Sequence, residues 1–175
     1  MPIAKLCKCL LALAFISAPA GAQLFTDEEA LANWREGDFE MPAAPQDAAL
    51  GAFFVSSASP NRFFIDRDTL AVDPDGVVRY VLVVRTPGGA ENVTFEGIRC
   101  ATHERRIYAS GRSDGTWSPA RNSRWEPIVN NSYNRVAAAL AREYFCDGPA
   151  PPRNRAEVLR RLRGGAGSGI DAVLR

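Results

Sequence analysis

Two apolar stretches on either side of a glycine-containing turn place the strongest constraint on how this chain folds. In residues 77–85 every even position is apolar, while the odd positions hold three valines, Arg79 and Arg85. Residues 86–89 read Thr-Pro-Gly-Gly, which reverses the chain, and residues 92–100 return as a second apolar stretch. Alternation with a period of two, interrupted by such a turn, predicts an antiparallel β-hairpin.

Shorter strand-like runs lie on either side of this hairpin, at residues 52–55, 63–65 and 105–109. Turn signals separate the runs, among them Asp73-Pro74-Asp75-Gly76. Successive short strands joined by turns indicate an antiparallel meander and not βαβ units. Gly97 falls inside the returning strand of the hairpin, where a glycine predicts a β-bulge.

One helical stripe follows in residues 131–145. Its apolar positions recur at steps of three and four residues and are Tyr133, Val136, Ala137, Leu140 and Tyr144. We therefore expect residues 51–146 to form an α+β domain. In it, an antiparallel β-sheet meander of four to six strands carries one C-terminal helix packed on a face.

The first 22 residues have the layout of a secretory signal peptide. Lys5 and Lys8 precede an apolar run, and Ala20-Gly21-Ala22 offers a small-residue cleavage site. The run is about ten residues long, whereas a bilayer core takes about 20. We therefore expect cleavage after Ala22, a periplasmic location and a mature chain that does not span the membrane.

Removal of this peptide would leave two of the four cysteines, Cys100 and Cys146. Two cysteines in an exported protein most simply form one disulfide. The alternative is a reactive thiol pair, but the close Cys-x-x-Cys spacing of redox motifs is missing. We expect the disulfide, which would join the end of the predicted helix to the returning strand.

The segments outside the domain differ in charge. Residues 23–50 carry seven acidic residues and one arginine. We expect this acidic leader to lie as a strap on the domain, held by Trp34 or Phe39; an acidic recognition arm is the alternative. Residues 147–175 are expected to be a flexible Pro/Gly/Arg-rich tail. Within it, residues 153–163 could form a short amphipathic helix, which we expect to be simply solvated. The alternative is that its arginines contact anionic lipid or a partner.

Charge and composition exclude several classes of function. With 21 basic and 20 acidic residues the net charge is +1, which argues against a nucleic-acid-binding protein. A single histidine, His103, excludes metal sites and relays that need two. The Asp73–Gly76 turn lacks the further ligands of a calcium loop, and the glycine-rich residues 164–169 lack the strand that precedes a phosphate loop. We expect no metal and no cofactor.

The strongest candidate for binding is a cluster of arginines around two tryptophans, of which we single out Arg106, Trp117 and Trp125. Arginine and tryptophan together suit anionic or saccharide surfaces; the alternative is a solvated sheet face with two core tryptophans. This cluster favours a non-enzymatic binding or envelope-associated module, with an envelope component or a protein as its partner. A purely structural interaction protein is another alternative.

Catalysis is the third alternative. A small envelope hydrolase could use paired carboxylates, for which the candidates are Asp66, Asp68, Glu96 and Glu104. Cys100 also lies three residues before His103, but a disulfide at Cys100 would remove that nucleophile. No convergent catalytic set is visible, so we identify no catalytic residue.

Several strings resemble the cryptic neisserial protein-like family of exported proteobacterial proteins. They are Arg62–Asp66, Asp75–Tyr80, Asn92–Cys100, Trp117, the segment from Trp125 to Ile128, and Tyr144-Phe145-Cys146. The resemblance covers roughly residues 36–146 and implies a periplasmic protein, with no particular activity because the family is of unknown function. Members are often described as lipoproteins, whereas this chain lacks a cysteine just after its cleavage site. A looser likeness to surface-adhesin protein E-type domains is architectural.

Overall fold

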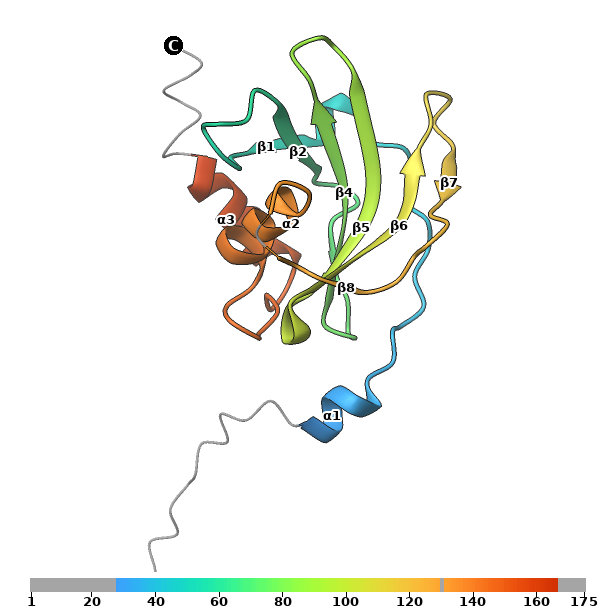
Figure 1. The fold of residues 1–175 in the computed structure, drawn as a ribbon, viewed down its shortest axis with the longest axis vertical. Helices are drawn as coiled ribbons and strands as arrows, with labels where there is room; N and C mark the ends of the chain where they lie inside the picture. Colours follow the sequence, from blue (N-terminus) through green and yellow to red (C-terminus); the bar gives the residue numbers. More distant parts are fainter. Residues whose placement is uncertain (1–27, 130, 167–175) are drawn as a thin grey trace, which may run out of the picture.

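A computed structural model describes residues 28–129 and 131–166. The expected signal peptide lies outside the described residues, as do residues 167–169 of the glycine-rich stretch. In the part of the chain that is described, an antiparallel sheet forms the centre of the molecule (Figure 1). No helix in this part is long and apolar enough to cross a membrane.

Six strands follow one another across the sheet in the order β1-β2-β4-β5-β6-β7, and every neighbouring pair is antiparallel. Their bounds are β1 Leu50–Phe53, β2 Arg62–Asp66, β4 Val77–Arg85, β5 Glu91–Arg99, β6 Glu104–Gly111 and β7 Trp117–Pro119. Two-residue strands pair beside them, β3 (Ala71–Val72) with β4 and β8 (Glu126–Pro127) with β6. The α+β class and the meander are confirmed, but the sheet has eight strands instead of four to six because β3 and β8 are too short to show a pattern.

The helices are short. Their bounds are α1 Glu28–Asn33, the 3₁₀ turns η1 Asp47–Ala49 and η2 Cys100–Thr102, α2 Arg135–Ala139, the π-helix η3 Leu140–Phe145, and α3 Arg155–Ala166. The helix expected over residues 131–145 thus begins at Arg135 and changes to a π-helix halfway. Tyr133 precedes it and is 67% exposed, so placing that side chain in the buried stripe was wrong.

One face of the sheet packs against the helices. The even positions of β4 expected to share a face, from Val78 to Leu82, are buried there against Leu140, Tyr144 and Phe145. The disulfide between Cys100 and Cys146 closes this core at one end, with Cα atoms 5.5 Å apart, so the predicted pairing is confirmed.

Part of the predicted tail belongs to this core. Val158 and Leu162 of α3 are buried against the same helix face of the sheet. The expectation that residues 147–175 form a flexible tail was therefore wrong for α3. The apolar stripe of α3 is short, but it packs against η3 and β1, and this packing holds the helix on the domain.

The other face carries a second, smaller core, which includes Val81, Val83 and Phe95. Residues 34–46, which we call the strap, run along this side of the sheet between α1 and η1 (Figure 1). The ring of Phe39 in the strap packs against Phe95 and Tyr108, with centroid separations of 5.8 and 4.4 Å. Helices and strap therefore cover opposite faces.

A β-bulge lies in β6, opposite the position that the sequence indicated. Phe95 pairs with Ala109 and Glu96 with Ile107, so Tyr108 is the extra residue. The bulge expected at Gly97 of β5 was wrong, because β5 alternates without interruption. A Cβ atom at Gly97 would lie 2.5 Å from the hydroxyl oxygen of Tyr108. Glycine is required there because the bulged tyrosine crosses directly over it.

Candidate functional site

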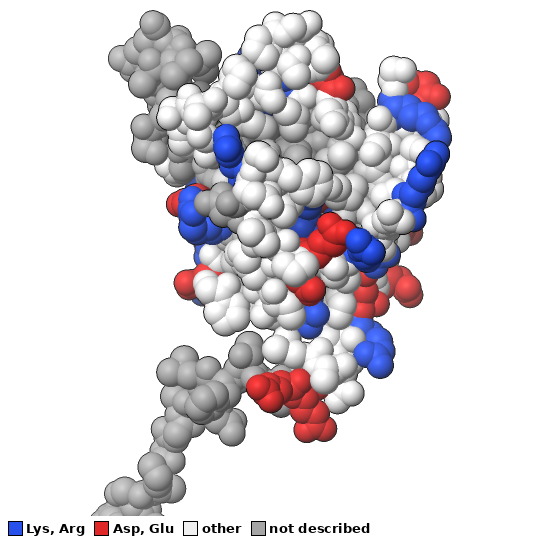
Figure 2. All heavy atoms as spheres, viewed as in Figure 1, with Lys and Arg blue, Asp and Glu red and all other residues white. Residues whose placement is uncertain are grey.

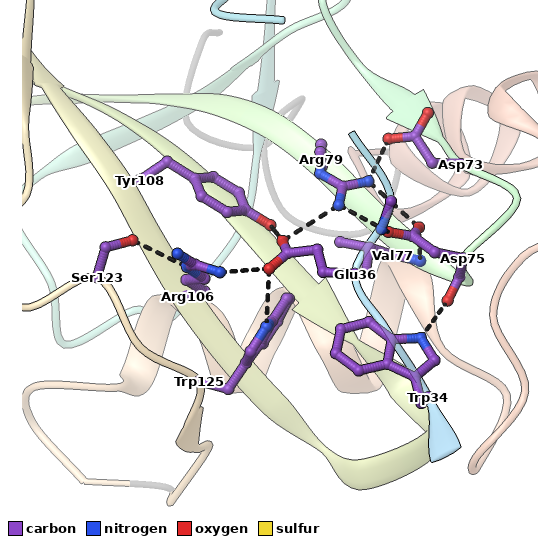
Figure 3. A network of polar contacts seen from close by, with 11 residues as sticks. Trp34, Glu36, Asp73, Asp75, Val77, Arg79, Arg106, Tyr108, Ser123 and Trp125 are labelled. Atoms are coloured by element: carbon purple, nitrogen blue, oxygen red, sulfur yellow. Dashed lines mark hydrogen bonds and ion pairs between the residues drawn. The ribbon is translucent and has the colours of Figure 1, made fainter. Parts of the chain in front are cut away.

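The carboxylate of Glu36, in the strap, is the centre of the most extensive polar network (Figure 3). Its Oε1 accepts hydrogen bonds from Tyr108 Oη (2.6 Å) and Arg79 Nη2 (3.2 Å). Its Oε2 accepts hydrogen bonds from Trp125 Nε1 (3.2 Å) and Arg106 Nη1. We call these four donors, Arg79, Arg106, Tyr108 and Trp125, the socket. Two positive charges and two neutral donors thus converge on one carboxylate.

Sheet register explains why the donors converge. Gly97 pairs with Arg79 on β4 and with Arg106 on β6, so the two arginines stand in one row on either side of a glycine. The missing side chain leaves room between them, and Tyr108 reaches into that room from the bulge. Three adjacent strands therefore build the socket, and Trp125 joins it from the segment just before β8.

Arg79 is only 2% exposed and is paired with more than Glu36. Its guanidinium also forms ion pairs with Asp73 (2.5 Å) and Asp75 (2.7 Å) of the turn between β3 and β4. Burial alone would lower the pKa of Arg79, but the carboxylates of Asp75 and Asp73 raise it above its ordinary value. The arginine therefore stays charged, and the predicted turn serves as its counter-ion and not as a calcium loop.

Asp75 links the socket to the backbone of the strap. Its Oδ2 accepts a hydrogen bond from the Gly37 amide (2.9 Å), and its carbonyl oxygen accepts one from Trp34 Nε1 (2.8 Å). Burial would raise the pKa of Asp75, yet hydrogen bonds from Arg79, Gly37 and Val77 lower it below its ordinary value. The strap is thus held through one charged turn as well as through Glu36.

Tyr108 is a donor in this network at any physiological pH. Burial raises the pKa of its phenol far above the ordinary value, and the hydrogen bond to Glu36 raises it further. A protonated phenol beside a carboxylate donates its proton into the hydrogen bond and does not compete for one. The socket as a whole is therefore a site for a carboxylate or another small anionic group.

The structure brings together the three residues singled out for binding. Arg106 and Trp125 lie in the socket, and Trp117 Nε1 donates a hydrogen bond to the carbonyl oxygen of Pro42 in the strap (2.7 Å). All three therefore contact the strap, and this part of the arginine and tryptophan cluster is covered by the chain itself. Arginines still line the edge of the sheet beside β7, while acidic side chains lie over α1 (Figure 2).

Sequence reasoning did not single out Glu36, Arg79 and Tyr108. Glu36 is one of seven acidic residues in the leader, and nothing in its neighbours distinguishes it. Arg79 carried a signal that could have been used, because an arginine in the middle of a strand of valines is expected to have a buried counter-ion.

The four carboxylates considered for hydrolysis do not form a shared site. Asp66 accepts hydrogen bonds from the Asp68 amide and the Thr69 hydroxyl within its own turn. Glu96 is buried on the helix face against Tyr80 and Thr94, and Glu104 bonds to the Thr102 hydroxyl. The Asp68 carboxylate, 80% exposed, pairs instead with Arg155 of α3 (3.8 Å). Asp66, Glu96 and Glu104 thus bond to separate partners, and no two of the four carboxylates share one.

No group of three or more metal-ligating side chains is arranged to hold a metal ion in residues 28–129 and 131–166. Cys100 is in the disulfide, so it has no free thiol that His103 could activate as a nucleophile.

A profile of the CNP1-like family matches residues 29–163, which is most of the chain. The chain belongs to the CNP1-like family. This CNP1-like chain is also similar to Cryptic neisserial protein 1 of Neisseria gonorrhoeae (strain ATCC 700825 / FA 1090), with 28% identity over 159 residues, which cover 81% of this chain and 78% of that protein. No solved structure matches the chain.

The family resemblance inferred from the sequence is therefore confirmed, while the looser likeness to adhesin-type domains stays a prediction. The range that matches the CNP1-like family contains the whole strap and every residue of the socket.

Proposed function

We propose that this CNP1-like chain is an exported, non-enzymatic binding module of the bacterial cell envelope. Its recognition surface is the socket together with Trp117, and its ligand is an extended acidic segment of a protein. The observation that carries the proposal is the binding of Glu36, whose single carboxylate is met by two arginines, a phenol and an indole.

The way the strap is attached supports this function. In the described part of the chain, side chains make the contacts, and no backbone-to-backbone hydrogen bond joins residues 34–45 to a strand. A segment held by a carboxylate, three indole N–H groups and aromatic contacts is held in the way that a bound peptide is held. The strap then occupies the surface as an intramolecular ligand.

An intramolecular ligand excludes competitors by its local concentration, which is in the millimolar range for a short tether. A binding test must therefore loosen the strap first. The mature chain carrying Trp34→Ala and Glu36→Ala keeps the sheet and removes two attachments. We would add a fluorescent peptide of residues 33–46 and follow its anisotropy, with the same peptide carrying Glu36→Gln as the matched control.

The expected result is binding of the peptide to the double variant and not to the wild-type chain. The glutamine peptide should bind about 10-fold more weakly or worse, because it loses a charge-assisted hydrogen bond. Adding Arg106→Gln to the double variant should have a similar effect. If the folded double variant does not bind the peptide, the socket only fixes the strap in place, and the result favours a purely structural role.

The envelope location rests on residues 1–22 and is tested separately. N-terminal sequencing of the protein recovered from a periplasmic fraction should begin at Gln23. Recovery of the uncleaved chain from the cytoplasm would contradict export, whatever the peptide experiment shows.

A further inference from the structure

A second site lies on the opposite side of the sheet from the strap, beside the disulfide. It is a cavity of about 540 Å³ whose lining includes Cys100, His103, Ile128, Ala141, Arg142 and Cys146. Cavities of about 300–1,000 Å³ are typical of small-molecule sites. The turn after β5 and the loop after η3 form its sides. Both segments lie near the lower end of the sheet in Figure 1.

Its wall is mainly apolar. The disulfide, Ile128 and a group of small residues form most of it; the small residues are Ala101, Ala138, Ala141 and Gly148. Small side chains leave the space open, because larger ones at these positions would fill it. The cavity therefore has the volume and the apolar wall to hold the apolar body of a small ligand.

Two unusual backbone features border this cavity. The φ angle of His103 is 53°, in the left-handed region, and no other non-glycine residue of the described part has a positive φ. The π-helix η3 closes with a hydrogen bond from the Cys146 amide to the Ala141 carbonyl oxygen (2.9 Å). Strained non-glycine residues and π-helical turns both concentrate at functional sites, and here they meet at one cavity.

Polar groups lie at the rim. Arg142 Nε forms an exposed ion pair with Glu143 (2.7 Å), which leaves its Nη atoms without a bond to a described residue. His103, an exposed residue, adds an imidazole to the lining. Apolar walls with a cationic group at the mouth suit a molecule that combines an apolar body with one negative charge.

We propose that this cavity binds a small carboxylate with an apolar body, which Arg142 orients through its free Nη atoms. The carboxylate lies at the rim between Arg142 and His103, and the body lies over the disulfide. The proposal does not depend on the socket or the strap, because the two sites share no residue.

The test uses the oxidised mature chain and two matched probes, 4-phenylbutyrate and 4-phenylbutanol. Both have the same apolar body, and only the first is charged. Titrations followed by ¹H–¹⁵N NMR should shift the amides around Thr102, Ile128 and Ala141 first. Ligands of this size should bind with a Kd on the order of 1 mM.

Two variants separate the roles of charge and space. Arg142→Gln should weaken 4-phenylbutyrate about three- to tenfold and leave 4-phenylbutanol unchanged, because one exposed charge-assisted hydrogen bond is lost. Ala101→Leu, at a half-buried position, should weaken both probes by filling the cavity. Arg124→Gln, an exposed arginine away from the cavity, is the matched control and should change neither.

Thermal melting would show that each variant is folded. The proposal is overturned if the probes shift residues elsewhere or do not bind at about 10 mM, far above the expected Kd. It is also overturned if Arg142→Gln affects the two probes equally.

Discussion

Replacing Glu36 by glutamine tests the physical account of the socket most directly. The substitution keeps the shape of the side chain and removes its charge. One of the two terminal atoms becomes an amide nitrogen, which can donate but not accept. It must face either Tyr108 and Arg79 or Trp125 and Arg106. Only the Tyr108 hydroxyl can rotate to accept, so the first orientation is favoured, and Arg79 loses a hydrogen bond.

The cost can be worked out from this geometry. Hydrogen bonds to charged groups contribute about 1.5–3 kcal/mol. Arg79 keeps Asp73 and Asp75, and Arg106 is 27% exposed, so solvent screens part of the remaining loss. We therefore expect a loss of about 2–3 kcal/mol in the free energy that holds the strap on the sheet. Because the strap can detach by itself, global stability falls by no more than this amount.

Amide exchange at Gly37, which donates to Asp75, reports strap release, and urea unfolding reports global stability. Glu40→Gln is the matched control, since Glu40 is an exposed strap residue without a hydrogen bond or ion pair to described residues. It makes the same charge change and should alter stability by less than about 0.5 kcal/mol. If the two variants give the same exchange rate at Gly37, the socket does not hold the strap and the reasoning above is refuted.

Three further outcomes follow from the structure. The pKa of Asp75 is lowered in the folded chain, so its contribution to stability is present above its ordinary pKa and is lost as pH falls through the folded value. Asp75→Asn should therefore flatten the acid side of the profile of unfolding free energy against pH. An unchanged slope would contradict this. Leu162→Ala should cost about 2–3 kcal/mol in urea unfolding and exposed Arg160→Ala less than about 0.5, unless α3 does not pack as described. Gly97→Ala should destabilise by about 1–3 kcal/mol because its methyl group displaces Tyr108; a neutral result would show that the crossing is loose.

The parts of the fold that sequence could predict are those governed by local patterns. Alternation over residues 77–85 and the glycine turn after them determine the β4–β5 hairpin and the faces of its side chains. Elimination among four cysteines was enough for the disulfide. The strap could be expected because an acidic segment with two aromatic residues needs a surface to bury them.

The parts that it could not predict depend on contacts between distant residues. Whether Arg106, Trp117 and Trp125 face solvent or the strap depends on which segment covers them, and the residues themselves do not encode that choice. The π-helical turn of η3 and the docking of α3 are likewise set by tertiary packing, which overrides the local pattern. The bulge at Tyr108 needed the pairing of two strands, so Gly97 alone indicated the wrong strand.

Glu36 lies far in the sequence from residues of the socket that bind it, and this separation constrains the order in which the protein folds. Glu36 precedes Arg106 by 70 residues and Trp125 by 89. A ribosome releases the N-terminus first, so the strap emerges before any of the residues that receive it. Arg79 is neutralised by Asp73 and Asp75 of the neighbouring β3–β4 turn. The sheet can therefore bury the charge of Arg79 before Glu36 is bound. The strap is therefore among the first segments to be synthesised, yet its binding is complete only after Trp125 has been made.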